Sequence, residues 1–318
     1  MSFVCLWWED ERNPLSENPT RSESFSNLDV RVDAERLHRN LQTIVGERSP
    51  FSGQHHLAEV ECFIEQELKG YGLCVESDGF SYRGKNFRNV VARHPAQTSG
   101  PLLILGAHID AVEGSPGADD NGSGVAVLLE AARLLASARL RSQMLFCAFN
   151  LEELNMIGST AFARKLKAAG EKVAGMISLE MVGYADSRPG SQRYPVGLAR
   201  HYPDRGDFIG VIGNWSSSAL LRKFSAQMRR VPNLPVETLS IPGKGWLIPA
   251  VRLSDHSPFW DLGYPALMVT DTSFYRNPNY HAHGDTADTL DIGFMARVCD
   301  GVIRGVLGLE ASDECNSE

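Results

Sequence analysis

Residues 102–124 read LLILGAHIDAVEGSPGADDNGSG, and this stretch decides the fold. Its apolar run, residues 102–105, predicts a buried strand that ends at His108, with Asp110 two residues further on. A loop with several glycines then leads to an acid pair that ends at Asp120, and apolar residues at helical spacing follow. Open α/β sheets carry their chemistry beyond the carboxyl ends of their strands. The stretch therefore predicts half of a metal site, held between a strand and a helix.

Two apolar runs further along the chain repeat this arrangement. Residues 144–149 precede Glu152 and Glu153, and residues 173–179 precede Glu180. Patterns typical of helices separate these strands, so we predict an α/β fold with a mixed, mostly parallel central sheet and helices on both faces. Because the carboxyl ends of parallel strands meet at one edge of a sheet, we expect the histidine and the three glutamates to converge.

Other elements are predicted around this centre from weaker patterns. Apolar residues at helical or alternating spacing mark them, and Gly, Pro and Asn mark the turns between them. The strands on either side of residues 83–86 are expected to form a hairpin. The further expected helices span 33–45, 55–69, 217–228, 258–262 and 292–309, and the further expected strands span 73–76, 89–93, 208–212, 236–239 and 266–270.

Composition and charge exclude several classes of function. The chain has 318 residues, a formal net charge of −8 and a pI near 5.6, so it lacks the basic surface that nucleic-acid binding requires. No apolar run approaches the roughly 20 residues of a transmembrane helix. The N-terminus, MSFVCLWWEDERNP, lacks the basic segment and long apolar core of a secretory signal, so we expect a cytoplasmic protein. The six cysteines are scattered and are expected to be mostly reduced.

The domain organisation follows from length and composition. We expect a single catalytic domain over residues 28–312, a poorly ordered leader over residues 1–27 and a polar tail over residues 313–318. Within the domain, the loop-rich region 186–256 is interrupted by several prolines, and long surface loops of this kind often carry function.

The expected cluster combines histidine with carboxylates, a ligand set that suits zinc and also admits manganese or cobalt. Asp120 is the candidate bridge, since each of its two carboxylate oxygens can bind one metal ion. In the pair Glu152 and Glu153, one residue can bind metal while its neighbour acts as general base. Asp110 can accept the second ring N–H of His108 and so fix the tautomer of that histidine.

Each of these features also has a purely structural interpretation. A Glu-Glu pair commonly begins a helix in solvent, an Asp-Asp-x-Gly sequence is often a turn, and a single histidine after a strand often has only a structural role. The metal-site interpretation is favoured because four separate elements present ligand-type residues.

Further motifs occur along the chain in a fixed order with those described above. The full series is His108-Ile109-Asp110, Pro116 to Gly124, Glu152-Glu153 with Ile157-Gly158-Ser159, Ser178 to Tyr184, Ser254-Asp255-His256, Tyr280-His281 and Asp285 to Thr289. These motifs, in this order, resemble those of the zinc aminopeptidases of metallopeptidase family 28, which also contains glutamate carboxypeptidase and glutaminyl cyclase. The similarity extends over residues 37–309 and implies the three-layer sandwich of the zinc exopeptidases.

The resemblance implies ligands for two zinc ions and a general base at Glu152. Glu180 stands where several family members have Asp, which keeps the carboxylate but lengthens its reach. The two expected ligand triads are His108, Asp120 and Glu180 for one ion, and Asp120, Glu153 and His281 for the other.

Neighbouring residues leave alternatives open. His283 competes with His281, and His281 is preferred because it directly follows Tyr280, as in the Tyr-His pattern of the family. Tyr280 either donates a hydrogen bond to the oxyanion formed during attack or packs in the core. The Asp255-His256 pair is interpreted as supporting the site or contacting substrate, although Asp255 also suits a helix N-cap.

We therefore expect a metal-dependent aminopeptidase that acts on peptides. The alternatives are a glutaminyl cyclase with one zinc and a non-catalytic binding domain on the same fold. The loops at 186–206 and 240–256 are expected to form the walls of the substrate pocket. The preferred side chain, carboxypeptidase against aminopeptidase activity, the native metal and the oligomeric state stay open at this point.

Overall fold

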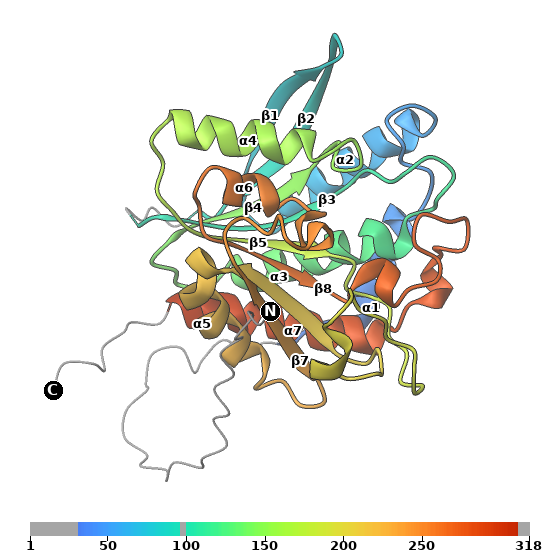
Figure 1. Cartoon of the computed structure of the whole chain (residues 1–318). Helices are drawn as coiled ribbons and strands as arrows, with labels where there is room; N and C mark the ends of the chain where they lie inside the picture. The colour runs from blue at the N-terminus through green and yellow to red at the C-terminus, as the bar shows by residue number, and fades with distance from the viewer. Residues whose placement is uncertain (1–30, 96–99, 311–318) are drawn as a thin grey trace, which may run out of the picture.

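The computed structural model describes residues 31–95 and 100–310, and the expected leader and polar tail lie outside this part of the chain (Figure 1). Within it, one eight-stranded sheet has the order β1-β2-β4-β3-β5-β8-β6-β7. The strands are β1 (Cys74–Tyr82), β2 (Lys85–Arg93), β3 (Leu102–His108), β4 (Gln143–Phe149), β5 (Val173–Glu180), β6 (Ile209–Asn214), β7 (Val236–Ile241) and β8 (Ala266–Thr270).

The sheet is parallel at its centre and mixed towards its edges. β3 lies between β4 and β5 and is parallel to both, and β5 is parallel to β8. β6 runs antiparallel to β8 and parallel to β7, while the β1–β2 hairpin joins β4 in antiparallel orientation. The predicted mixed, mostly parallel α/β fold is thus confirmed.

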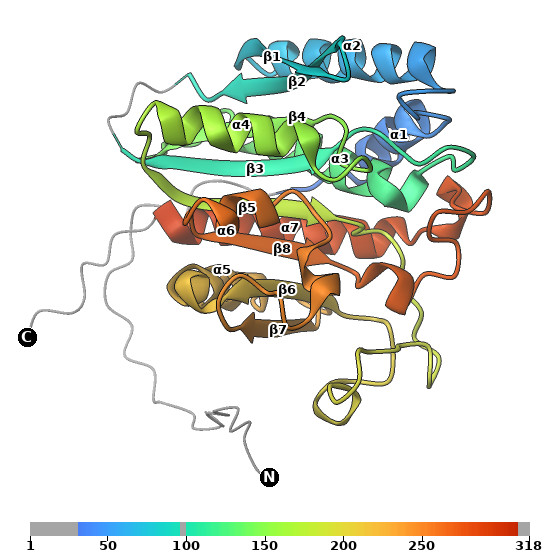
Figure 2. The same cartoon turned by 45° about the horizontal axis from the view of Figure 1, so that its top comes forward.

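Helices cover both faces of this sheet, as Figure 2 shows. One core lies between the sheet and α1, α2, α3, α5 and α7, and a smaller one lies beneath α4 and α6. Apolar burial on both faces explains why β3 is buried along its whole length. The helices are α1 (Ala34–Ile44), α2 (Gln54–Gly70), α3 (Gly124–Leu135), α4 (Ile157–Ala168), α5 (Ser218–Met228), α6 (Ser257–Asp261) and α7 (Ile292–Glu310).

The β1–β2 hairpin is longer than its sequence predicts. The two strands pair from Cys74 with Arg93 to Tyr82 with Lys85, and Figure 1 shows them projecting beyond the body of the molecule. Most of β1 is exposed or half-buried, so its outer half carries no strong apolar signal. The turn residues Arg83 and Gly84, at φ 48° and 76°, close the hairpin and let backbone pairing continue beyond the core.

None of the helices in residues 31–95 and 100–310 is long and apolar enough to cross a membrane.

Candidate metal centre

The last residue of β3, His108, is buried at the carboxyl edge of the sheet. Its Nδ1 lies 3.1 Å from the backbone carbonyl oxygen of Asp110, whereas the nearest carboxylate oxygen of Asp110 is 3.7 Å away. The expected hydrogen bond from the ring to the carboxylate is therefore replaced by one to the carbonyl, which leaves Nε2 directed at the acids of the site.

The carboxylate of Asp110 instead supports the loop after β4. Its two oxygens accept hydrogen bonds from the backbone N–H groups of Glu152, at 3.0 Å, and Glu153, at 3.1 Å. Asp110 is fully buried, so these bonds replace the water that its carboxylate loses on folding. Asp110 thus fixes the backbone from which both glutamate side chains extend.

Asp120 lies between the two histidines of the site. Its Oδ1 is 3.2 Å from Nε2 of His108, and its Oδ2 is 3.1 Å from Nε2 of His281. The buried carboxylate of Asp285 holds this loop by accepting the backbone N–H groups of Asp119, at 2.8 Å, and Asp120, at 3.1 Å. The two oxygens of Asp120 therefore face different histidines, as a ligand that bridges two metal ions requires.

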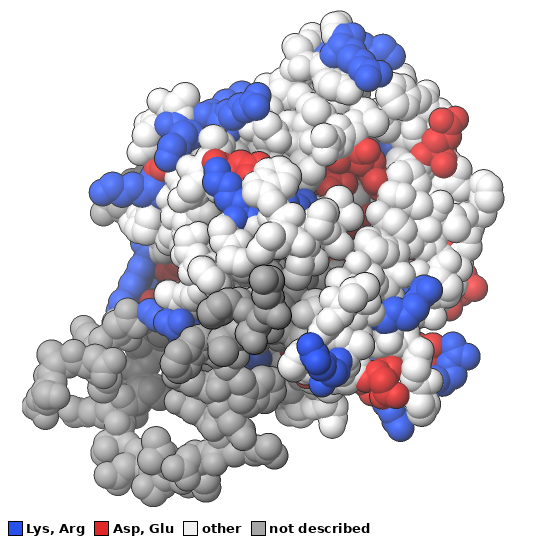
Figure 3. Space-filling view, in the orientation of Figure 1, with Lys and Arg blue, Asp and Glu red and all other residues white. Residues whose placement is uncertain are grey.

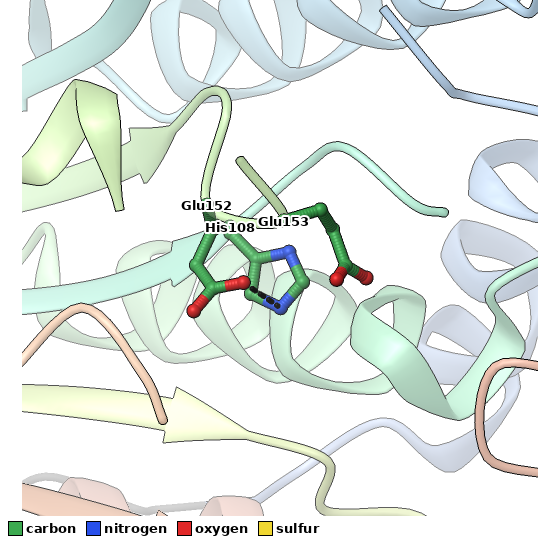
Figure 4. A group of neighbouring side chains, drawn as sticks. All are labelled: His108, Glu152 and Glu153. Atoms are coloured by element: carbon green, nitrogen blue, oxygen red, sulfur yellow. Dashed lines mark ion pairs between the residues drawn. The ribbon is translucent and has the colours of Figure 1, made fainter. Parts of the chain in front are cut away.

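Three glutamates complete the cluster from two other strand ends. Oε2 of Glu153 is 3.2 Å from Nε2 of His281, and Oε2 of Glu180 is 3.5 Å from Nε2 of His108. Glu152 lies slightly further off, with Oε2 3.9 Å from the same nitrogen of His108. Figure 4 shows the side chains of Glu152 and Glu153 extending from one loop on either side of the imidazole of His108.

The donor atoms fit metal ions. Both expected triads occur as groups whose ligand atoms all lie within 4.8 Å of one another, and a further such group is formed by His108, Glu152 and Glu153. Within the described chain, Nε2 of His108, Oε1 of Glu153 and Oε2 of Glu180 are buried without a hydrogen-bond partner. Because buried polar atoms are rarely left unpaired in proteins, these atoms fit a bound metal ion.

The electrostatics of the cluster point in the same direction. Burial raises the pKa of Glu152 well above its ordinary value and raises that of Glu153 to about 7. Burial also disfavours the charged form of Asp120, but hydrogen bonds with His108 and His281 keep its pKa below the ordinary value. A divalent cation would offset the crowding of like charges and keep all the carboxylates ionised.

His283 lies apart from the cluster. Its side chain is exposed, its ring lies near Gly114, and it belongs to none of the acid and histidine groups found in the described residues. Tyr280 lies at the site, with its ring stacked on that of His281 at a centroid distance of 3.8 Å. The expected roles of His281 as ligand and of Tyr280 as oxyanion donor remain predictions.

Asp255 and His256 are fully buried and do not line either pocket at the site. Nε2 of His256 donates a hydrogen bond to the carbonyl oxygen of Val251 at 2.8 Å, and its ring meets the edge of Trp260. His256 therefore supports the loop before α6 and has no direct access to substrate.

Sequence reasoning missed Arg48, a fully buried side chain next to the site. Its guanidinium donates hydrogen bonds at 2.7–3.0 Å to five backbone carbonyl groups, and three of these belong to the loop that joins β3 to Asp120. No pattern around this residue marks it, because its partners are backbone atoms of segments distant in sequence. The acceptors are the carbonyl groups of Ile44, Gly46, Ile109, Pro116 and Gly117.

Two adjoining pockets open at the centre. One of them is acidic and is lined by Asp120 and by all three glutamates of the cluster. The other is mostly apolar and shares Glu180, Leu253 and Tyr280 with the acidic pocket. Residues 193–202 and 250–253 form part of its wall, as expected, and residues 272–275 and the strands β6, β7 and β8 form the rest. Figure 3 shows acidic side chains recessed in a hollow among uncharged ones.

Comparison with known proteins finds a matching family model and several similar sequences. The model of peptidase family M28 matches residues 89–306. The uncharacterized protein YfbL of Escherichia coli (strain K12) is 40% identical over 252 residues, which cover 76% of this chain and 77% of that protein. A probable leucine aminopeptidase of Arthroderma otae is 27% identical over 307 residues, covering 89% of this chain and 75% of its own length.

Solved structures share the fold. LapB from Legionella pneumophila superposes with a TM-score of 0.71 at 22% identity, covering 90% of this chain and 74% of its own. BSAP, a zinc aminopeptidase from Bacillus subtilis, gives a TM-score of 0.69 at 15% identity, covering 91% and 98%. At these identities the likeness extends to the fold alone.

Proposed function

This chain belongs to peptidase family M28, and from that membership we propose that it is a zinc-dependent aminopeptidase with two metal ions. The observation that carries the proposal is the pair of triads that share Asp120. His108 and Glu180 would complete one metal site, and Glu153 and His281 the other. When bound, the two ions would polarise the scissile carbonyl and lower the pKa of the hydrolytic water.

Glu152 is the proposed general base. Its carboxylate lines the acidic pocket, but it belongs to neither of the two triads that share Asp120. It can therefore accept the proton of the attacking water at a carboxylate oxygen and then deliver it to the leaving amine. Asp110 positions this group by holding the N–H groups of Glu152 and Glu153. Tyr280, which lines both pockets, would donate a hydrogen bond to the developing oxyanion.

Two observations favour cleavage at the amino end of the peptide. The relatives include a probable leucine aminopeptidase. Among the described residues, no Lys or Arg lines the acidic pocket, so it offers no cation to bind the carboxylate of a peptide C-terminus. The apolar pocket next to it is suited to the side chain of the N-terminal residue.

The test combines activity and metal content. Purified protein is assayed on aminoacyl p-nitroanilides, on the same compounds acetylated at the amine, and on a peptide with N-terminal glutamine, each with and without chelator. Chelator-sensitive hydrolysis of the free amines alone, with two zinc ions per chain, supports the proposal.

Each other outcome contradicts the proposal in a defined way. Cleavage of the acetylated compounds rejects aminopeptidase specificity. Cyclisation of the glutamine peptide with one zinc per chain identifies a glutaminyl cyclase. A zinc-loaded protein that turns over none of these compounds supports the binding-domain alternative.

A further inference from the structure

The floor of the apolar pocket contains a row of residues that crosses four strands. In the strand register Glu180 lies beside Thr270, Thr270 beside Gly210, and Gly210 beside Glu237. Residues directly opposite one another on paired strands face the same side of a sheet. The row therefore leads from a proposed metal ligand at one end to a second carboxylate at the other, and all four residues line the pocket.

One of the two middle positions of this row carries no side chain, because the residue there is Gly210. A Cβ atom on Gly210 would stand 3.2 Å from the carbonyl oxygen of Thr270 and 3.8 Å from its Cγ2, so any side chain at this position would fill the floor. Adjacent strands lie about 4.8 Å apart, so the backbone of Glu180 is roughly 14 Å from that of Glu237. A leucine side chain is too short to approach Glu237, whereas a lysine or arginine side chain, together with the side chain of Glu237, extends over most of this span.

Aromatic residues line the apolar pocket. The rings of Tyr194 and Tyr202 are stacked at a centroid distance of 5.7 Å, and Phe208, Phe274 and Tyr275 also line this cavity. Aromatic faces attract cations through their ring electrons. The walls are therefore suited both to the methylene groups and to the charged end of a long basic side chain.

Glu237 itself is half-buried, and its carboxylate has no hydrogen bond or ion pair with another described residue. Burial raises its pKa, and the charge of the nearby Arg229 lowers it. The guanidinium of Arg229 is engaged with Ser225 and Thr238 on the neighbouring helix and strand. Arg193 is exposed, and its guanidinium donates to the carbonyl of Phe274.

We propose that Glu237 is a specificity-determining residue that binds the cationic end of an N-terminal lysine or arginine side chain. The inference rests on the proposed aminopeptidase function and names its substrate class. The apolar walls hold the methylene groups of the side chain, and the carboxylate of Glu237 pairs with the ammonium or guanidinium group. Peptides with shorter apolar N-terminal residues occupy only the near part of the pocket.

The test compares lysine with norleucine, which has the same carbon chain without the ammonium group. Values of kcat/KM are measured for lysyl, arginyl and norleucyl p-nitroanilides with the wild type, Glu237→Gln and Glu237→Asp. Glu237→Gln is expected to lower kcat/KM for the lysyl and arginyl substrates about 10- to 100-fold and to leave the norleucyl value within about threefold. Glu237→Asp keeps the charge, so its kcat/KM for the lysyl and arginyl substrates should lie between the values of the wild type and of Glu237→Gln.

Asp204→Asn is the matched control, because Asp204 is an exposed acid of the nearby loop that does not line the pocket. It removes the same charge and should leave the ratio of lysyl to norleucyl kcat/KM unchanged. Calorimetric binding of the uncleavable amino alcohols lysinol and norleucinol gives a second readout, in which only lysinol binding should weaken in Glu237→Gln.

The outcomes separate this inference from the proposed function. Norleucine cleavage with the same lysine preference in wild type and Glu237→Gln overturns the role of Glu237 and leaves the aminopeptidase intact. An equal loss for all three substrates in a folded Glu237→Gln protein also overturns it. Failure to cleave any aminoacyl substrate rejects the proposed function itself.

Discussion

Glu152 and Glu153 are adjacent in the chain, but their carboxylates face different partners. Glu153 lies 3.2 Å from Nε2 of His281 and belongs to a triad with Asp120, whereas Glu152 is 3.9 Å from His108 and lines the acidic pocket. Both backbone N–H groups are held by Asp110, so replacing either side chain should leave the loop in place.

Glutamine substitutions should therefore separate a base from a ligand. Glu152→Gln keeps the shape of the side chain but removes the proton acceptor, so we expect kcat to fall about 10²- to 10⁴-fold with two zinc ions still bound. Glu153→Gln should lose or weaken one ion. Elemental analysis and turnover on both proteins check this. Metal loss in Glu152→Gln with retention in Glu153→Gln would show the reverse assignment, and normal activity in both would mean that neither acid takes part.

Burial of His256 makes stability depend on pH. Desolvation lowers its pKa to about 3, from an ordinary value of 6.5, while Nε2 remains hydrogen-bonded to Val251. Below pH 6.5 the unfolded chain therefore binds a proton that the folded protein excludes, and the free energy of unfolding falls as the pH falls. The expected loss between pH 8 and pH 5 is roughly 2 kcal/mol.

The variant His256→Gln keeps a donor for Val251 but cannot titrate in this range. Its free energy of unfolding, measured with urea at pH 5 and pH 8, should fall by less than that of the wild type. All other titrating groups are common to both proteins and cancel in the comparison. An identical fall in the two proteins would exclude His256 as the source.

Among elements, the loop between β3 and α3 depends on a residue that lies outside it. Arg48 follows α1, and its guanidinium binds carbonyl oxygens of Ile109, Pro116 and Gly117, on the segment that leads from His108 to Asp120. Burial lowers the pKa of Arg48 only to about 10, so it stays charged at neutral pH. The positive charge of Arg48 is compensated by the dipoles of the carbonyl groups that it binds and by nearby acids.

Arg48→Met should thus be strongly destabilising, because it removes five hydrogen bonds at once from backbone carbonyl groups that are buried or half-buried. We expect a loss of about 3 to 5 kcal/mol in the free energy of unfolding, measured by urea denaturation of the zinc-free protein. Arg304→Met is the control, since Arg304 forms only a partly exposed pair with Asp300 on α7 and should cost less than about 1 kcal/mol. Similar losses in the two variants would contradict this role of Arg48.

The sequence predicts residues at strand ends better than it predicts contacts within polar loops. His108, Glu153 and Glu180 of the candidate metal centre follow apolar runs, so their convergence was predictable from the positions of β3, β4 and β5. Arg48 was not, because its partners are backbone atoms, and any residue type supplies those. The predicted hydrogen bond from His108 to the carboxylate of Asp110 was wrong, because the backbone brings the carbonyl oxygen of Asp110 closer to the ring than its carboxylate.

The same contrast holds for the pocket. The loops at 186–206 and 240–256 were expected to form the pocket walls, and residues within 193–202 and 250–253 line the pocket. Glu237, in contrast, was part of a short strand with no mark of function. Its relation to Glu180 depends on the order β5-β8-β6-β7, and the order of strands in a sheet is set by packing of the whole chain. Sequence patterns therefore predicted the cluster of acids and histidines better than they predicted the pocket.

For the molecule as a whole, the metal centre joins segments that are far apart in the chain. His108, Asp120, Glu153, Glu180 and His281 come from β3, from the loop before α3, from the loop after β4, from β5 and from the segment after β8. An ion bound by these residues stabilises only the folded state, because the unfolded chain does not hold them together.

Zinc should therefore raise the unfolding temperature, and the two candidate histidines should differ in their effect. At a free zinc concentration about 100 times each dissociation constant, every site adds about 2.7 kcal/mol, so removal of both ions should lower the Tm on the order of 10 °C. His281→Ala should lose part of this zinc-dependent shift, whereas His283→Ala should keep all of it, because His283 is exposed and lies outside both triads. The measurement is calorimetric unfolding of the three proteins in chelator and in buffered zinc, with elemental analysis of each.

A Tm that does not respond to zinc contradicts the metal centre. Loss of the shift in His283→Ala alone transfers the ligand role to that histidine, and a single ion per wild-type chain rejects the bridging role of Asp120.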